Sequence, residues 1–153
     1  VELGIRKLMK AEEAQGLPSK NYVYKFDVPI PGWDNPGTFH SVDLWFFFES
    51  LAKCWRPFTG MHYDIARHMC NYMCNFIKTG NPNDDGVKSA GLSASAGVNY
   101  QPTKAEYIER QKAEKETMPE WKPFSSKEPN VMIFGKECSP QVYKPSAEIS
   151  KYI

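Results

Sequence analysis

The sequence predicts an α/β fold that is incomplete on its own. Residues 22–28 alternate between apolar and polar side chains with a period of two, as a strand does, whereas residues 61–79 carry apolar side chains at helical spacing. The other strand candidate is the short segment 131–134. Because two strands do not form a stable sheet, we expect the chain to be the C-terminal piece of a larger α/β domain. A compact, mostly helical domain with a small hairpin-like pairing is the alternative.

Composition narrows the class of protein. The chain has 153 residues, which suits one domain, and its 19 basic and 18 acidic residues leave a net charge of +1. Such a balance gives no broad attraction to nucleic acid or to an anionic membrane. No apolar run reaches the roughly 18 residues that span a bilayer, and the N-terminus lacks the pattern of a signal peptide. We expect a soluble protein, cytoplasmic or secreted, without a membrane span and without nucleic acid as a partner.

The first elements are a helix and a strand. Residues 3–15 fit a helix that Gly16 ends. The short apolar side of this helix consists of Ile5, Leu8 and Met9. In the strand 22–28, Lys25 and Asp27 face one way and four apolar side chains face the other. These four are Tyr22, Tyr24, Phe26 and Val28.

A loop and two helices follow. The prolines and glycines between residues 29 and 37 predict a rigid, irregular loop that delivers His40. After His40 the pattern becomes helical, with Asp43 in the first turn, where a carboxylate suits the helix dipole. A second helix fits residues 61–79, and Gly80 is its natural stop. Its apolar stripe consists of Ile65, Met69, Tyr72, Met73, Phe76 and Ile77.

The next part of the chain differs in composition. Residues 87–101 are small and polar and predict a flexible loop, and residues 103–117 predict a highly charged helix. A solvated surface explains that helix most simply, and a partner-binding face is the alternative. Within the loop, Ser93–Gly97 resembles a nucleophile elbow with its first glycine replaced. An elbow needs a strand before it and a helix after it, and neither pattern is present here.

Cysteines and histidines offer a second kind of site. The cysteines are Cys54, Cys70, Cys74 and Cys138. Cys70 and Cys74 share one face of a helix, and a metal site would add His62 and His68 to them. Buried free thiols that pack as small apolar groups are the simpler interpretation, and we expect both histidines to be structural or exposed.

His40 is the strongest catalytic candidate from the residues alone. A histidine is suited to general base catalysis because its ordinary pKa lies close to the working pH. His40 stands at the end of the proline- and glycine-rich loop, directly before a dense aromatic segment. No convincing nucleophile accompanies it in this chain. A surface or structural role is the alternative for a lone histidine in such a loop.

Five segments in order carry a resemblance to a known family. They are residues 22–26 (YVYKF), 37–44 (GTFHSVDL), 76–83 (FIKTGNPN), 121–124 (WKPF) and 131–135 (VMIFG). Together they resemble the C-terminal part of the type-B carboxylesterases, the α/β-hydrolase group that also contains the cholinesterases. The resemblance covers roughly residues 1–83 and 119–135. It implies the C-terminal portion of an α/β-hydrolase fold, with a late sheet strand plus helices, over residues 1–153, and a probable insertion at residues 87–118.

The resemblance also implies a mechanism. His40 matches the catalytic histidine of a serine esterase, and the serine and the acid, which precede the histidine in this fold, would lie upstream of Val1. The implied substrate is a small carboxylic ester, the implied partner is the missing N-terminal part of the same fold, and no cofactor or metal is implied. This chain alone is then expected to be inactive. A non-catalytic, esterase-like binding domain is the alternative function.

Three further residues complete the expected site. Asp43 is either an acceptor near the catalytic centre or simply a favourable first-turn carboxylate, and Trp33 and Phe39 are candidates for walls of the substrate pocket.

Overall fold

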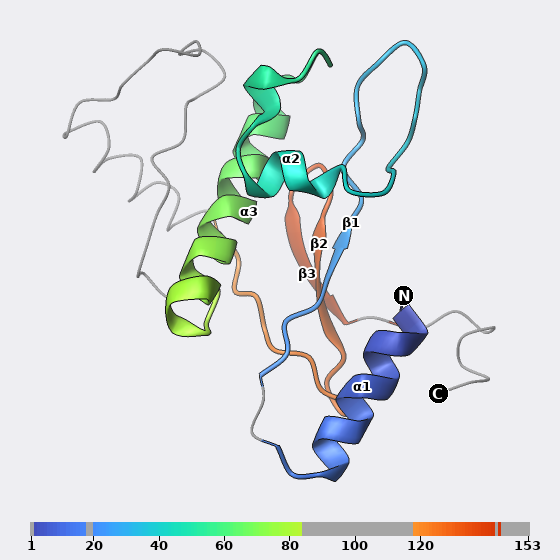
Figure 1. Ribbon diagram of the computed structural model, residues 1–153, viewed down its shortest axis with the longest axis vertical. Coiled ribbons are helices and arrows are strands. Elements are labelled where there is room, and N and C mark those ends of the chain that lie inside the picture. The colour runs from blue at the N-terminus through green and yellow to red at the C-terminus, as the bar shows by residue number, and fades with distance from the viewer. Residues whose placement is uncertain (1, 18–19, 84–117, 143, 145–153) are drawn as a thin grey trace.

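The structure, a computed structural model, describes residues 2–17, 20–83, 118–142 and 144. The predicted flexible loop, the charged helix and the Ser93–Gly97 motif lie outside these residues. Figure 1 shows a small sheet with helices α2 and α3 on one side and α1 on the other. The elements in chain order are α1 (Glu2–Ala14), β1 (Tyr24–Phe26), α2 (Asp43–Phe47), the 3₁₀-helix η1 (Leu51–Lys53), α3 (Gly60–Thr79), β2 (Asn130–Phe134) and β3 (Cys138–Val142).

The sheet has three strands in the order β1-β2-β3, of which the sequence predicts two. β1 and β2 run parallel, with Tyr24 opposite Met132 and Phe26 opposite Phe134. The hairpin-like alternative is therefore wrong for these two strands. β3 pairs antiparallel with β2. It has no apolar alternation and contains Pro140, which an edge strand tolerates because one row of its backbone groups faces outward.

The alternation in residues 22–28 is confirmed as the two faces of β1, although only Tyr24–Phe26 form the strand itself. The predicted aromatic face packs against the core shared with α2 and α3, where Val28 is fully buried. On the other face, Val23 packs against Met9 of α1. Lys25 and Asp27 are exposed, as the pattern predicts.

The two long helices confirm the predicted bounds to within one residue, but not all of their predicted apolar sides. Ile5 and Leu8 of α1 are exposed, because only the turn around Met9 reaches the sheet. The last turn of α3 leaves Phe76 and Ile77 43% and 73% exposed. After that turn the chain folds back, and the Asn75 side chain of α3 donates a hydrogen bond to the Pro82 carbonyl.

Both long helices end at a glycine, as predicted. Gly80 caps α3 in the left-handed conformation, with φ of 74°. Gly16 has φ of 65°, and the N–H groups of Gly16 and Leu17 donate to the carbonyls of Glu13 and Glu12. This pair of bonds is the Schellman motif, which satisfies carbonyls at a helix end and favours glycine at the left-handed position.

Trp121 lies at the centre of the main core. Its ring contacts Tyr72 and Phe134 edge-on at centroid distances of 5.4 and 5.5 Å. Its indole N–H donates to the Val23 carbonyl at 3.1 Å. These contacts join α3, β2 and the segment before β1 into one packed unit. Among the described helices, none combines the length and the apolar character needed to cross a membrane.

The side chain of Asn83 binds the backbone of Trp121. Its amide nitrogen donates to the Trp121 carbonyl at 2.8 Å, and its amide oxygen accepts from the Trp121 N–H at 2.7 Å. The asparagine thus pairs with the backbone as a strand residue would. Asn83, the last residue of the Gly80–Asn83 turn, thus fixes the start of the segment that leads from Trp121 to β2.

Candidate functional site

His40 lies in the loop that follows the carboxyl end of β1. This loop extends beyond the sheet and returns to it at α2 (Figure 1). In α/β sheets, ligands bind outside the carboxyl ends of parallel strands, and β1 is parallel to β2. The His40 side chain is exposed, so its imidazole is available to a reacting group.

The loop is fixed to the fold near both of its ends. At its start, His62 of α3 shares a 2.9 Å hydrogen bond between Nε2 and the Pro29 carbonyl. His62 Nδ1 accepts from the Thr59 N–H at 3.0 Å, so Nε2 carries the proton and donates. At the other end, the Thr38 hydroxyl donates to the Val28 carbonyl at 3.2 Å. The prediction that His62 is structural is confirmed by these contacts.

Arg56 holds the middle of the loop. Its guanidinium makes a bidentate pair with Asp34, with N···O distances of 3.0 and 2.9 Å. The hydrogen bonds from Arg56 hold the pKa of the Asp34 carboxyl below its usual range, and the same bonds raise the pKa of Arg56. The Arg56 side chain is 7% exposed and that of Asp34 is 32% exposed, so the pair closes the loop against the body of the domain.

Within the described ranges, the imidazole of His40 has one side-chain partner. A hydrogen bond of 2.5 Å joins its Nδ1 to the Ser41 hydroxyl, and the ring tautomer sets which atom donates. Ser41 has φ of 65°, an uncommon conformation for a residue with a Cβ. In a catalytic triad an acid binds Nδ1 while Nε2 takes the proton of the nucleophile. The Ser41 hydroxyl therefore binds the ring nitrogen that the acid binds in such a triad.

Asp43 begins α2, as predicted, and contacts the sheet. Its carboxylate accepts a 2.8 Å hydrogen bond from the Tyr24 hydroxyl. Burial, together with this hydrogen bond and the negative charge of Asp43, raises the pKa of Tyr24 well above its ordinary value. The bond ties α2 to β1 and so fixes the element that follows His40. A role for Asp43 near the reacting atoms stays a prediction.

The two residues predicted to line the substrate pocket, Trp33 and Phe39, differ in how exposed their side chains are. Trp33, at the tip of the loop, is 92% exposed. Phe39 is partly covered: its ring meets Trp45 edge-on at 6.0 Å, and the Arg56 guanidinium lies 5.6 Å from its centroid. Their role as walls of a substrate pocket stays a prediction.

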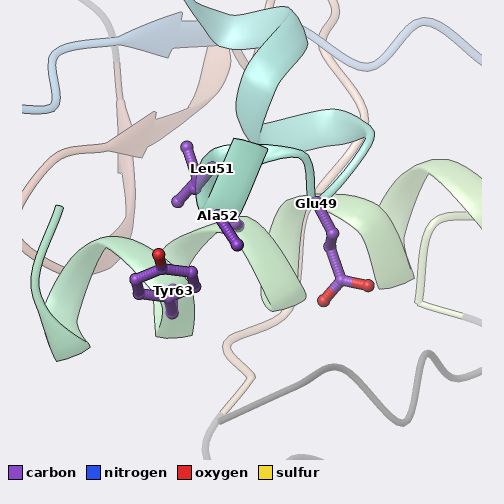
Figure 2. A pocket seen from close by; sticks show the side chains of 5 residues that line it. Glu49, Leu51, Ala52 and Tyr63 are labelled. Atoms are coloured by element: carbon purple, nitrogen blue, oxygen red, sulfur yellow. The ribbon is translucent and has the colours of Figure 1, made fainter. Parts of the chain in front are cut away.

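Two of the small cavities in the described part of the chain lie elsewhere. One, of about 110 Å³, lies between α3 and the segment before it, and Figure 2 shows Glu49 and Tyr63 among the side chains that line it. The other, of about 120 Å³, is almost entirely aromatic and apolar. Its lining residues are Tyr22, Tyr24, Phe47, Tyr72, Met73, Phe76, Pro82 and Trp121. His40 lines neither cavity.

Three of the four cysteines contact another sulfur or a histidine. Cys70 and Cys74 lie with their sulfurs 3.9 Å apart, and Cys138 Sγ lies 3.5 Å from His68 Nδ1. Burial raises the pKa of the Cys138 thiol to about 12, and burial lowers the pKa of His68. Both groups are therefore neutral, and a neutral thiol is a poor nucleophile. Across the described ranges, no three or more His, Cys, Asp or Glu side chains gather as a metal site would need.

Arg56 and Ser41 are the site residues that sequence reasoning missed. Arg56 pairs with Asp34 across 22 residues, and no periodic pattern connects two such positions. For Ser41 the signal was present, because a hydroxyl directly follows His40 in the sequence. Its importance depends on the left-handed backbone that turns the hydroxyl toward the ring.

Comparison with known proteins gives a family match. A family model described as "Carboxylesterase family" matches residues 1–148. No curated protein matches the chain. Several solved structures do match it.

An esterase from Clostridium hathewayi superposes with a TM-score of 0.57 at 17% identity, over 91% of this chain and 20% of that protein. Carboxylesterase EST55 of Geobacillus stearothermophilus superposes with a TM-score of 0.55 at 18% identity, over 93% of this chain and 23% of that protein. For PNB esterase the TM-score is 0.52 at 18% identity, over 91% of this chain and 23% of that protein. The chain thus spans about a fifth of the length of these structures, and at these identities the likeness shows the α/β-hydrolase fold.

Proposed function

Because the chain belongs to the carboxylesterase family, we propose that it is the C-terminal part of a serine-dependent carboxylic ester hydrolase in which His40 is the general base. The observation that carries the proposal is the placement of His40. It is an exposed histidine at the end of a braced loop, beyond the carboxyl end of a parallel strand. That is where an α/β sheet presents its reactive groups.

The proposed reaction proceeds in two halves. A serine hydroxyl attacks the ester carbonyl carbon while His40 Nε2 takes its proton, and the imidazolium then gives that proton to the departing alcohol. Water repeats the sequence on the acyl-serine, so the carboxylic acid leaves and the serine hydroxyl is restored. An acid bound to Nδ1 stabilises the imidazolium. That acid takes over the position that the Ser41 hydroxyl holds in this structure.

We place the serine, the acid and the donors to the oxyanion upstream of this chain. In this fold the order along the chain is serine, acid, histidine. The chain also spans about a fifth of the length of the esterases that it resembles in structure. The partner of this chain is then the preceding part of the same fold, the substrate class is small carboxylic esters, and the chain by itself does not hydrolyse them.

The test is His40→Ala in the complete protein that contains this chain. Removal of the base should lower kcat on a p-nitrophenyl ester by several orders of magnitude, about 10³-fold or more, as loss of a triad member does. His68→Ala is the matched control. His68 lies in α3 and contacts Cys138 of β3, so its removal does not touch the His40 loop. Hydrolysis by His40→Ala at the wild-type rate would overturn the assignment of His40 as the base. Absence of hydrolysis in the wild-type protein would instead favour the esterase-like binding domain.

A further inference from the structure

We propose that Arg56 is the positioning residue of His40: a buried guanidinium that fixes the loop in front of the base. The inference rests on the proposed function for its catalytic consequence. The clasp itself, defined here as Arg56 with Pro31, Gly32, Asp34 and Phe39, rests only on contacts within the chain. Its residues come from two segments that are about 20 residues apart in sequence.

The guanidinium binds the loop at two points. Nη1 donates to the Pro31 carbonyl at 3.0 Å and to Asp34 Oδ1 at 3.0 Å, and Nη2 donates to Asp34 Oδ2 at 2.9 Å. A planar fork that meets both carboxylate oxygens fixes orientation as well as distance. The three bonds therefore define the path of residues 31–34.

The same guanidinium also reaches the residue before His40. Its carbon lies 5.6 Å from the centroid of the Phe39 ring and 4.5 Å from that of Trp55. An arginine near two aromatic rings gains cation–π attraction at each. The Phe39 ring is in turn held edge-on by Trp45. A fixed Phe39 side chain leaves the backbone of the next residue, His40, little freedom to move.

Gly32 shows how closely the clasp is packed. A Cβ built at this position would collide with Arg56 Nη1 and with Asp34 Oδ1. Because glycine has no Cβ, the space at this position stays free for the bidentate pair of Arg56 and Asp34. Gly32→Ala supplies a second, independent way to disturb the clasp without removing any of its charged groups.

Lysine cannot replace Arg56 in this role. Its ammonium is a point charge and cannot meet both carboxylate oxygens and the Pro31 carbonyl in one plane. We therefore expect Arg56→Lys to keep the positive charge beside Asp34 but to lose the bidentate contact that fixes the path of the loop. A displacement of about 1 Å in a catalytic group costs up to roughly 100-fold in rate.

The kinetic test compares kcat and KM in the complete protein. Arg56→Lys and Gly32→Ala should each lower kcat on a p-nitrophenyl ester by about 10- to 100-fold, with KM within about threefold of wild type. Arg67→Lys is the matched control, because Arg67 pairs with the exposed Asp64 on α3, and its kcat should stay within about twofold of wild type.

In the His40→Ala background, Arg56→Lys should lower kcat no further, since Arg56 acts through His40. An additive further loss there, or wild-type kcat in Arg56→Lys, would overturn the proposal.

Hydrogen–deuterium exchange of the same variants separates the clasp from the chemistry. Peptides that cover residues 30–41 should exchange faster in Arg56→Lys and Gly32→Ala, whereas peptides from α3 should not change. If His40→Ala keeps its activity but the loop still loosens, the proposed function fails and the clasp stands. If His40→Ala is inactive and the loop exchanges at the wild-type rate in both clasp variants, the clasp fails and the function stands.

Discussion

At the residue scale, the site depends on contacts that neutralise or orient polar side chains. Ser41 binds the nitrogen of His40 that an acid is expected to take, and Arg56 compensates the charge of Asp34. Tyr24 and Asp43 form a third such contact. The pair of Arg56 and Asp34 joins the loop to the segment before α3, and the bond between Tyr24 and Asp43 joins α2 to β1. A single-residue change at any of them is therefore expected to act on the geometry of the site.

The contact between Tyr24 and Asp43 predicts a specific dependence on alkaline pH. The pKa of Tyr24 is higher in the folded chain than in the unfolded chain, so the folded state binds more protons above the unfolded value of about 10. The stability that this group contributes is thus complete below about pH 10 and decreases as the pH rises further.

Tyr24→Phe provides the measurement. We expect the variant to be less stable than wild type by about 2 kcal/mol at pH 8, the value of a hydrogen bond to a charged group. The difference should shrink at pH 11, because only the wild type loses the contribution of the tyrosine. Urea unfolding at both pH values checks this, and Tyr63→Phe, which leaves the bond to Asp43 intact, is the control. A difference that is constant or grows with pH would contradict the prediction.

At the scale of elements, the turn after α3 acts as a connector. Asn83 replaces a missing backbone partner for Trp121, whose indole lies at the centre of the aromatic core. Asn83 and Trp121, which flank the segment between them in the chain, are therefore held next to each other by these bonds. The asparagine side chain thus fixes the backbone of Trp121, while the ring is held by its contacts in the core.

We expect Asn83→Ala to destabilise the fold by about 2 kcal/mol, since it removes the two hydrogen bonds to Trp121, of about 1 kcal/mol each, together with an exposed bond to Asn81. Asn83→Asp should destabilise to at least the same degree, because its carboxylate loses the donor and faces the Trp121 carbonyl. Thermal unfolding, followed by tryptophan fluorescence, measures both. Asn130→Ala, which removes a single bond to the Pro123 carbonyl, is the control and should cost less. Wild-type stability in both Asn83 variants would show that the connector is dispensable.

At the scale of the whole molecule, β1 lies at an edge of the sheet. The edge of β1 that faces away from β2 has no strand partner among residues 2–17, 20–83 and 118–142. Its apolar face packs on α2 and α3, and Val23 packs toward α1. The edge of a strand presents backbone N–H and C=O groups with which a further strand can pair. This supports our expectation that further strands, from the preceding part of the fold, continue beyond β1.

The joined ends of the segment between Asn83 and Trp121 predict that much of it can be removed. Met118 packs against the core, and Pro119 accepts a hydrogen bond from Tyr72, so the deletion should stop at residue 117. We expect replacement of residues 87–117 by a Gly/Ser linker about a quarter as long to leave the fold intact. Because loop closure costs about 0.6 kcal/mol per doubling of length, stability should rise by about 1 kcal/mol. Circular dichroism and thermal unfolding check this, and loss of cooperative unfolding would contradict the insertion.

The sequence by itself determined the local elements. Periodicity located the helices and two strands, glycines marked both helix ends, and the ordered segments around His40 indicated the carboxylesterase family. These signals are local, because a repeat of 2 or 3.6 residues is complete within a few turns.

Only the tertiary structure decided how these elements meet. It showed that β1 and β2 are parallel, that the proline-containing β3 is a strand, and that the ends of the predicted apolar stripes are exposed. It also joined Arg56 to the His40 loop and Asn83 to Trp121. Such pairings join residues that are far apart in the sequence and meet only in the folded chain. A single pair of this kind produces no repeating pattern from which the sequence could predict it.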